Sequence, residues 1–103
     1  MARIIVTESA SVDEAAILND LNTKAGLQTV VKFRTLFRNL YDRLGDHPDI
    51  GAPRPAFGQN IRIGIVSPYI IIYRHSAEDD TVTMLRIVHG RRRITGKLLA
   101  ENR

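Results

Sequence analysis

The chain has 103 residues, 44% of them hydrophobic and 25% charged, which is typical of a globular protein. This length suits a single domain, so we expect residues 1–103 to form one unit. It contains no cysteine, which excludes a disulfide scaffold, a zinc–thiolate site and a thiol nucleophile. No apolar run approaches the roughly 18 residues of a membrane span. We therefore expect a cytoplasmic protein with no membrane segment and no signal peptide.

The net charge of +4 is unevenly distributed along the chain. Residues 1–52 hold 6 basic and 7 acidic side chains, whereas residues 53–103 hold 9 basic and 4 acidic ones. A negatively charged partner is therefore expected to meet the C-terminal half.

Residues 3–6 form a short apolar run of strand type, and a first helix is expected after it. Ser11 and Glu14 match the spacing of a capping box, which predicts that this helix starts at Ser11. Gly26 suits the position just past its C-terminus. Its expected apolar stripe consists of Ala15, Leu18, Leu21 and Ala25.

A second helix is predicted from a clear apolar stripe that ends near Gly45, the expected stop. Only a few residues separate the two helices, so we expect an antiparallel helical hairpin. The stripe consists of Val30, Phe33, Phe37, Leu40 and Leu44.

Residues 46–59 are rich in proline and glycine and are expected to form a loop. Three strands should follow, at 60–66, 69–75 and 81–88, joined by a turn at Ser67-Pro68 and an acidic turn at 77–80. The predicted fold class is α+β, an N-terminal helical hairpin packed on a small antiparallel sheet, which the strand at 3–6 also joins. The last ten residues are expected to form a short helix or a loose tail.

Arginine recurs once on each of these three strands, at Arg62, Arg74 and Arg86. We expect the helices to cover the face that carries Ile61, Ile63, Ile65, Tyr69, Ile71, Tyr73, Thr83, Leu85 and Ile87. The opposite face would then carry Arg62, Gly64, Ile70, Ile72, Arg74, Val82, Met84 and Arg86. Such a mixed apolar and cationic face is typical of a partner site. The alternative is that arginine stems merely cover apolar strands.

A second basic feature follows the last strand, where His89 and Gly90 precede Arg91, Arg92 and Arg93. Clustered arginines bind phosphate groups and polyanions. The alternative is a solvated basic turn, and no aromatic residues interleave to stack on bases.

Signals for catalysis, metals and cofactors are weak. His47, His75 and His89 are far apart, without the spacing of metal ligands. No nucleophile elbow, phosphate-binding loop or dinucleotide fingerprint occurs. We therefore predict no catalytic residue, no metal and no cofactor.

The order of motifs resembles the RelE/ParE toxins of bacterial toxin–antitoxin modules, and most closely the ParE branch. The resemblance rests on the strings YIIIYR at 69–74, DTV at 80–82 and LRIVHGRR at 85–92, and on GAPRP at 51–55. Arg93 departs from the acidic residue that many relatives carry there. The resemblance implies a growth inhibitor that a small ParD-like antitoxin wraps and silences.

The two branches of this family differ in their target. RelE-like members cleave messenger RNA on the ribosome and keep a Tyr or His near the C-terminus, whereas ParE-like members are held to poison DNA gyrase without hydrolytic chemistry. No Tyr or His follows His89 in this chain. Arginine stays protonated and is a poor proton shuttle, so a general acid or base is missing there.

We therefore predict a ParE-like gyrase inhibitor that is not an enzyme. The predicted antitoxin-binding residues are Arg62, Ile72, Arg74 and Arg86, and the predicted target-binding residues are His89, Arg91, Arg92 and Arg93. Direct contact with nucleic acid is expected only as part of a complex. Two alternatives stay open: a RelE-like ribosome-dependent endoribonuclease that uses His89 as its base, and a basic adaptor that binds nucleic acid through residues 91–93.

Overall fold

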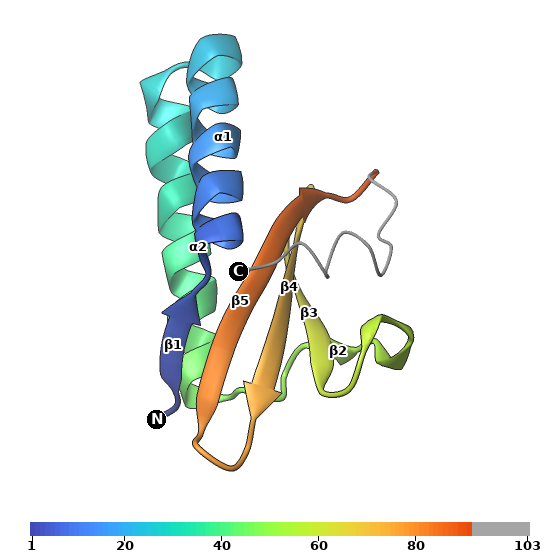
Figure 1. Cartoon of the computed structure of the whole chain (residues 1–103). Helices are drawn as coiled ribbons and strands as arrows, with labels where there is room; N and C mark the ends of the chain where they lie inside the picture. The colour runs from blue at the N-terminus through green and yellow to red at the C-terminus, as the bar shows by residue number, and fades with distance from the viewer. Residues whose placement is uncertain (92–103) are drawn as a thin grey trace.

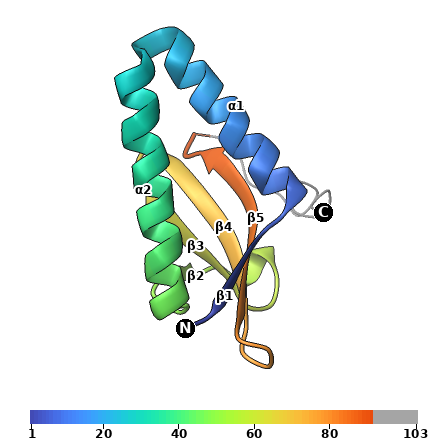
Figure 2. The same ribbon diagram turned by 90° about the vertical axis from the view of Figure 1, so that its left-hand side faces the viewer.

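The computed structural model describes residues 1–91 and has an α+β fold, which confirms the predicted class (Figure 1). Two long helices form an antiparallel hairpin that lies against one face of a sheet (Figure 2). In chain order the elements are β1 (Arg3–Val6), α1 (Glu8–Ala25), α2 (Leu27–Asp46), β2 (Ala52–Pro53), η1 (Pro55–Phe57), β3 (Ile61–Val66), β4 (Tyr69–Ser76) and β5 (Thr81–His89). The expected helix or tail at the end of the chain lies outside the described residues.

The sheet has five strands in the order β1-β5-β4-β3-β2. Strands β3, β4 and β5 form the predicted antiparallel meander. Strand β1 joins it as expected, parallel to β5. The segment expected to be only a loop also contributes β2, which pairs with β3 at two positions, and the short helix η1.

The predicted start of the first helix at Ser11 is wrong, because Thr7 caps the helix instead. The Thr7 hydroxyl accepts a hydrogen bond from the Ala10 amide at 3.1 Å and donates one to the Met84 carbonyl at 2.8 Å. Thr7 thus ends β1, starts α1 and ties both to β5. Glu14, the expected partner in the capping box, accepts a hydrogen bond from Tyr41 of α2 at 3.0 Å instead.

The predicted apolar stripe of α1 is only partly correct. Leu18 is buried and Leu21 packs against the core, but Ala15 and Ala25 are exposed, and the second buried residue of α1 is Ala10. The hairpin extends beyond the end of the sheet, so that no strand of residues 1–91 lies beneath its tip (Figures 1 and 2). Ala25 lies at that tip.

The stripe of α2 is confirmed, with four of its residues buried and Phe33 half-buried. Gly26 ends α1 with φ 88°, as predicted. The expected stop at Gly45 is one residue early, since α2 continues to Asp46. Gly45 is buried and its carbonyl accepts a hydrogen bond from the Ala2 amide at 2.7 Å, so the glycine packs against the residues just before β1.

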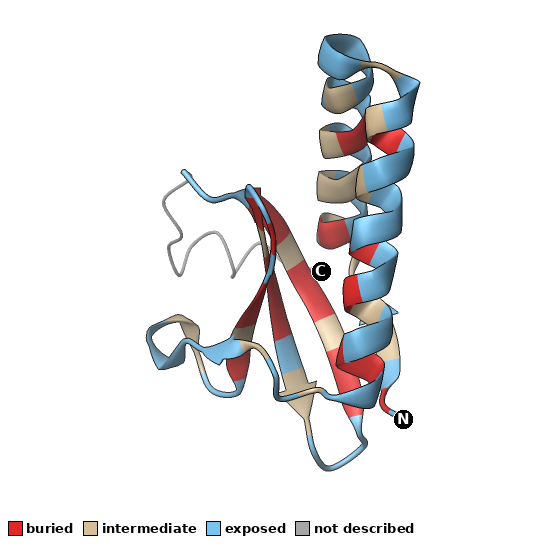
Figure 3. Cartoon of the chain, turned by 180° about the vertical axis from the view of Figure 1, so that it is seen from behind, coloured by how far each residue is buried: buried red, intermediate tan, exposed pale blue. Residues whose placement is uncertain are grey.

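Two hydrophobic clusters lie on the two faces of the sheet. We call the face under the helices the inner face and the opposite one the outer face. The inner cluster joins α1 and α2 to Val66, Tyr69, Ile71, Tyr73, Val82, Met84 and Ile87. The outer cluster contains Ile61, Ile63, Ile72, Leu85 and Val88, with Phe57 and Ile70 packed against it. Figure 3 shows both helices exposed on their outer sides and the strands largely buried.

The predicted assignment of the two faces is therefore partly wrong. Ile61, Ile63 and Ile65 lie on the outer face, because Val66 pairs with Tyr69 and this register places Gly64 under the helices. A Cβ at Gly64 would come within 3.0 Å of Leu40, so α2 packs closely over β3 at this glycine.

A bulge exchanges the faces of part of β5. Ile72 pairs with Arg86 but Tyr73 pairs with Met84, which leaves Leu85 as an extra residue. As a result Val82 and Met84 lie on the inner face and Leu85 on the outer face, the reverse of the expectation.

Candidate functional site

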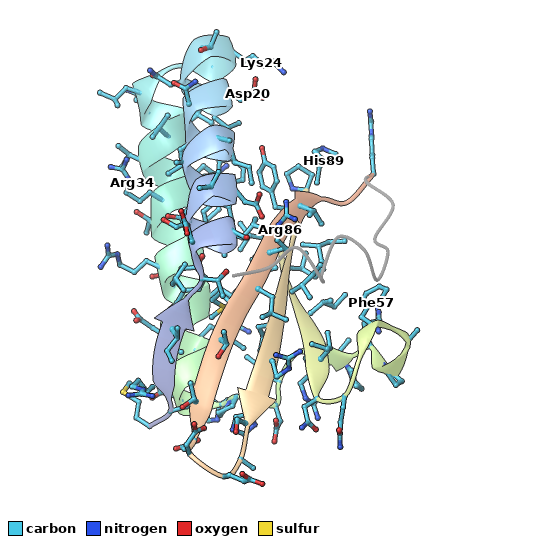
Figure 4. The ribbon with its side chains drawn as sticks, in the orientation of Figure 1. Asp20, Lys24, Arg34, Phe57, Arg86 and His89 are labelled. Atoms are coloured by element: carbon cyan, nitrogen blue, oxygen red, sulfur yellow. The ribbon has the colours of Figure 1, made fainter. Side chains whose placement is uncertain are left out.

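Arg86 is held at the joint between α1 and β5. Its Nε lies 2.7 Å from Oδ2 of Asp13 and its Nη2 lies 3.0 Å from Oδ1 of the same carboxylate. The Ile87 amide also donates to Asp13 Oδ2, at 3.0 Å. Both charged side chains are largely buried (12% and 14% exposed), so this bidentate pair anchors α1 to the strand. Figure 4 shows Arg86 between the helix and β5.

Arg62 is not on the outer face with the other strand arginines, which corrects the prediction. It pairs with Tyr73 and so lies toward the inner face, half-buried at the start of β3. Its Nη1 donates to the carbonyls of Asp49 and Gly51 at 2.9 and 2.8 Å. Arg62 therefore holds the segment between α2 and β2 in place.

Arg74 is the predicted antitoxin-binding residue that is exposed. It lies on the outer face of β4 and pairs with Ile61 on one side and Thr83 on the other. Ile72, two residues earlier on the same face, is fully buried in the outer cluster. The register thus puts Ile72, Arg74 and Arg86 on the outer side of their strands, but the guanidinium of Arg86 contacts Asp13 of α1, and of these three residues Arg74 alone is exposed.

His89 ends β5 and is exposed. Its ring meets the ring of Tyr69 edge to face, with the centroids 5.8 Å apart. Its Nδ1 accepts a hydrogen bond from the Arg91 amide at 3.1 Å, so in the neutral ring the proton lies on Nε2. Arg91 is exposed beside it. Arg92 and Arg93 lie outside the described residues.

A cavity of about 330 Å³ lies between His89 and α1, with Ile17, Asp20 and Tyr69 in its lining. Burial raises the pKa of the Tyr69 phenol, and the nearby Asp20 carboxylate raises it further. Both effects favour the neutral phenol in the folded protein. Figure 4 shows Asp20 and Lys24 above His89 on α1.

Sequence reasoning missed a cluster at the opposite end of the sheet. His75 lies with Nδ1 2.8 Å from Asp49 and Nε2 3.4 Å from Asp80, while Nε of Arg62 lies 3.5 Å from the same Asp49 oxygen. Asp49, Arg62 and His75 line a cavity of about 630 Å³. Nothing in the spacing of the four residues signals this contact, because the β4–β5 turn and the segment after α2 bring them together.

The two histidines of the sheet, His75 and His89, already contact other groups of the protein. Both ring nitrogens of His75 face carboxylates, and one ring nitrogen of His89 is already engaged. Within residues 1–91, no group of three or more histidine and acidic side chains is arranged to hold a metal ion. No helix in that range is both long and apolar enough to cross a membrane.

Comparisons with known proteins agree with this architecture. A structure described as the chromosomal ParDE TA system from P. aeruginosa superposes with a TM-score of 0.71 at 21% identity, covering 86% of this chain and 96% of that one. No curated protein matches the chain. The family model for the ParE toxin of the type II toxin–antitoxin system parDE matches residues 4–94. The chain therefore belongs to the ParE toxin family.

Proposed function

We propose that this chain is the toxin of a type II module, that it inhibits DNA gyrase by binding, and that a ParD-like antitoxin neutralises it. The observation that carries the proposal is the ParE family match over residues 4–94. The toxin acts as one domain of residues 1–103 in the cytoplasm, where its target lies. Nucleic acid is contacted only within the complex of toxin, gyrase and DNA.

The geometry supports binding rather than hydrolysis. A general base must lie within hydrogen-bond reach of the proton that it abstracts and must have an accepting atom available. The accepting nitrogen of neutral His89 already takes the Arg91 amide proton. A RelE-like ribonuclease, which is the second candidate, would need His89 to exchange this contact for substrate.

The antitoxin contacts the outer face through Arg74. The similar structure is described as a ParDE system, and this description points to a ParD-type partner for the present chain as well. Arg74 is exposed, whereas Ile72 is buried in the outer cluster. Arg86 is paired with Asp13, and Arg62 donates to backbone carbonyls, so both of these arginines stabilise the fold. We therefore expect Arg74 to make the direct contact among the four predicted residues.

The target is contacted through His89, Arg91, Arg92 and Arg93. His89 and Arg91 are exposed at the end of β5, just beyond Arg86 and Ile87, which bond to Asp13 of the hairpin. Arginine forks suit acidic side chains and phosphates, both of which gyrase bound to DNA presents.

A cleavage assay tests the target. Purified toxin is incubated with gyrase and supercoiled plasmid, and linear DNA is measured after detergent and protease treatment. We expect linear DNA to accumulate with the native toxin, and less of it with Arg91→Ala. The matched control is Arg34→Ala, an exposed arginine on α2 far from His89, which should behave as the native chain does (Figure 4).

The ribonuclease alternative makes a different prediction. It requires messenger RNA on ribosomes to be cut in the presence of the toxin, and the cutting to disappear in His89→Ala. Translation that proceeds unchanged, together with linear DNA in the gyrase assay, would exclude this alternative.

A further inference from the structure

The edge of the sheet at β3 is only half covered. Strand β2 pairs with β3 at Ile63 and Arg62, and the Arg54 amide donates to the Ile61 carbonyl at 2.8 Å. In an antiparallel ladder the backbone groups of alternate residues point to opposite neighbours. The Ile61, Ile63 and Ile65 backbone groups therefore point away from β4, and within residues 1–91 no strand pairs with Ile65 on that side.

The side chain at this position is also unusual for a strand edge. Ile65 is 58% exposed, although the other two isoleucines of β3 are buried. Proteins commonly protect open edges with charged residues, proline or a covering loop. Here the uncovered residue is a β-branched apolar one, which suits pairing with another strand.

An apolar cavity of about 280 Å³ opens beside this edge, between β3 and α2. Its walls include Leu40, Leu44, Ile50 and Gly64, and Arg54 lies at its lining. Gly64 helps to create this space, because a Cβ there would fill it toward Leu40.

We propose that an extended segment of the antitoxin adds to the sheet as a strand beside β3, at Ile65. One of its residues packs against Ile65 on the outer face, and the next inserts an apolar side chain into the cavity between β3 and α2. Strand addition supplies affinity through backbone hydrogen bonds and specificity through pockets for alternate side chains. Arg54 favours an acidic residue in the same segment. This inference rests on the proposed function, because it needs an antitoxin partner.

The direct test is backbone hydrogen exchange in the toxin alone and in its complex with the ParD-like antitoxin of the same module. The Ile65 amide should exchange quickly in the toxin alone and about a hundredfold more slowly in the complex. The amides of Gly64 and Val66 point toward β4 and serve as internal controls that are protected in both states.

A second test measures antitoxin binding by a toxin variant substituted at Ile65. Ile65→Lys places a charge on an exposed position of the edge, so the fold should be retained and antitoxin binding should weaken about tenfold or more. The matched control is Leu27→Lys, which is 69% exposed at the start of α2, about 20 Å along the helix from Leu40. We expect this control to change affinity by less than about twofold.

The results distinguish strand addition at Ile65 from the existence of an antitoxin partner. A complex that forms with unchanged exchange at Ile65 and unaffected binding by Ile65→Lys would overturn strand addition and leave the antitoxin partner in place. Absence of any complex between the folded toxin and this antitoxin would overturn the proposed partner and this inference together.

Discussion

Strands β1 and β2 pair with only part of β5 and β3, and the remaining residues of these two strands differ in how they are covered. At the β5 edge, β1 pairs with residues 81–84, and the next positions are taken by Thr7, whose amide donates to Met84, and by Asp13, which accepts from Ile87. At the β3 edge, β2 ends its pairing at Ile63 and leaves Ile65 exposed. Beyond β1, the chain itself covers the rest of β5, which we call the closed edge; beyond β2, the backbone and side chain of Ile65 stay uncovered within residues 1–91, and we call this side of β3 the open edge.

Two arginines of the sheet, Arg86 and Arg74, differ in the same way: one stabilises the fold and the other is free to meet solvent or a partner. Arg86 lies at the closed edge, where its contact with Asp13 fixes α1 to the sheet. Arg74 lies on the outer face of the central strand β4, opposite Ile61, and is exposed. Substitutions that break the Arg86–Asp13 contact should therefore change stability, and substitutions of the exposed Arg74 should change binding.

The largest effect is expected for Asp13→Ala. The substitution removes both contacts to Arg86 and the acceptor of the Ile87 amide, so the free energy of unfolding should fall by about 3 kcal/mol. Urea denaturation measures this change. Asp20→Ala is the control, because it breaks only an exposed pair with Lys24 and should cost about 0.5 kcal/mol or less. Equal effects of the two substitutions would contradict the assigned role of Asp13.

Tyr73→Phe tests the segment that carries β2 to the open edge. The Tyr73 hydroxyl donates to the Pro48 carbonyl at 2.7 Å and accepts from the Gly51 amide at 3.0 Å, and the residue is fully buried. Losing both bonds should lower the free energy of unfolding by about 2 kcal/mol. Hydrogen exchange should also quicken at Gly51 but not at Ile87. Unchanged exchange at Gly51 would show that the hydroxyl does not hold this segment.

Tyr41→Phe tests the hairpin alone. Burial, followed by the charge and the hydrogen bond of Glu14, raises the pKa of the Tyr41 phenol well above its ordinary value of 10.0. Because the folded state favours the neutral phenol, its contribution to stability is present below pH 10 and is lost as the pH rises through the folded-state pKa. Removing the hydroxyl should cost about 1 kcal/mol at pH 7 and reduce the loss of stability above pH 10. Denaturation curves at pH 7 and pH 11 measure both effects, and an unchanged alkaline loss would assign it to other groups.

The smallest effect on stability is expected for Arg74→Glu. The side chain is exposed, so the free energy of unfolding should change by less than about 0.5 kcal/mol. Antitoxin binding should nevertheless weaken, because the charge reversal repels an acidic arm. Calorimetry measures the affinity, and an unchanged value would remove Arg74 from the antitoxin interface.

The elements of this fold could be predicted from hydrophobic periodicity and turn residues, as α2 and the three meander strands show. The register of β3 against β4 can also be predicted from the sequence, by counting residues through the turn. The two-residue turn at Ser67-Pro68 pairs Val66 with Tyr69, and this pairing puts Ile61, Ile63 and Ile65 opposite to the face of Tyr69. Hydrophobicity alone puts the three isoleucines of β3 under the helices, whereas the two-residue turn puts them on the outer face.

Other features depend on tertiary contacts that no local pattern reports. The bulge at Leu85 changes the face of half a strand without a glycine to mark it. Asp13 lies within an apparent helix-start motif, yet its partners are 73 and 74 residues away in the sequence. The arginine face was therefore predicted as one surface, whereas the structure assigns Arg62 and Arg86 to holding the fold and leaves Arg74 exposed.

The most direct test of the account is a titration of antitoxin into gyrase supercoiling reactions that contain the folded toxin. The account predicts that the toxin stops supercoiling, and that activity returns as antitoxin is added. Supercoiling that continues unchanged in a large excess of folded toxin would contradict gyrase as the target.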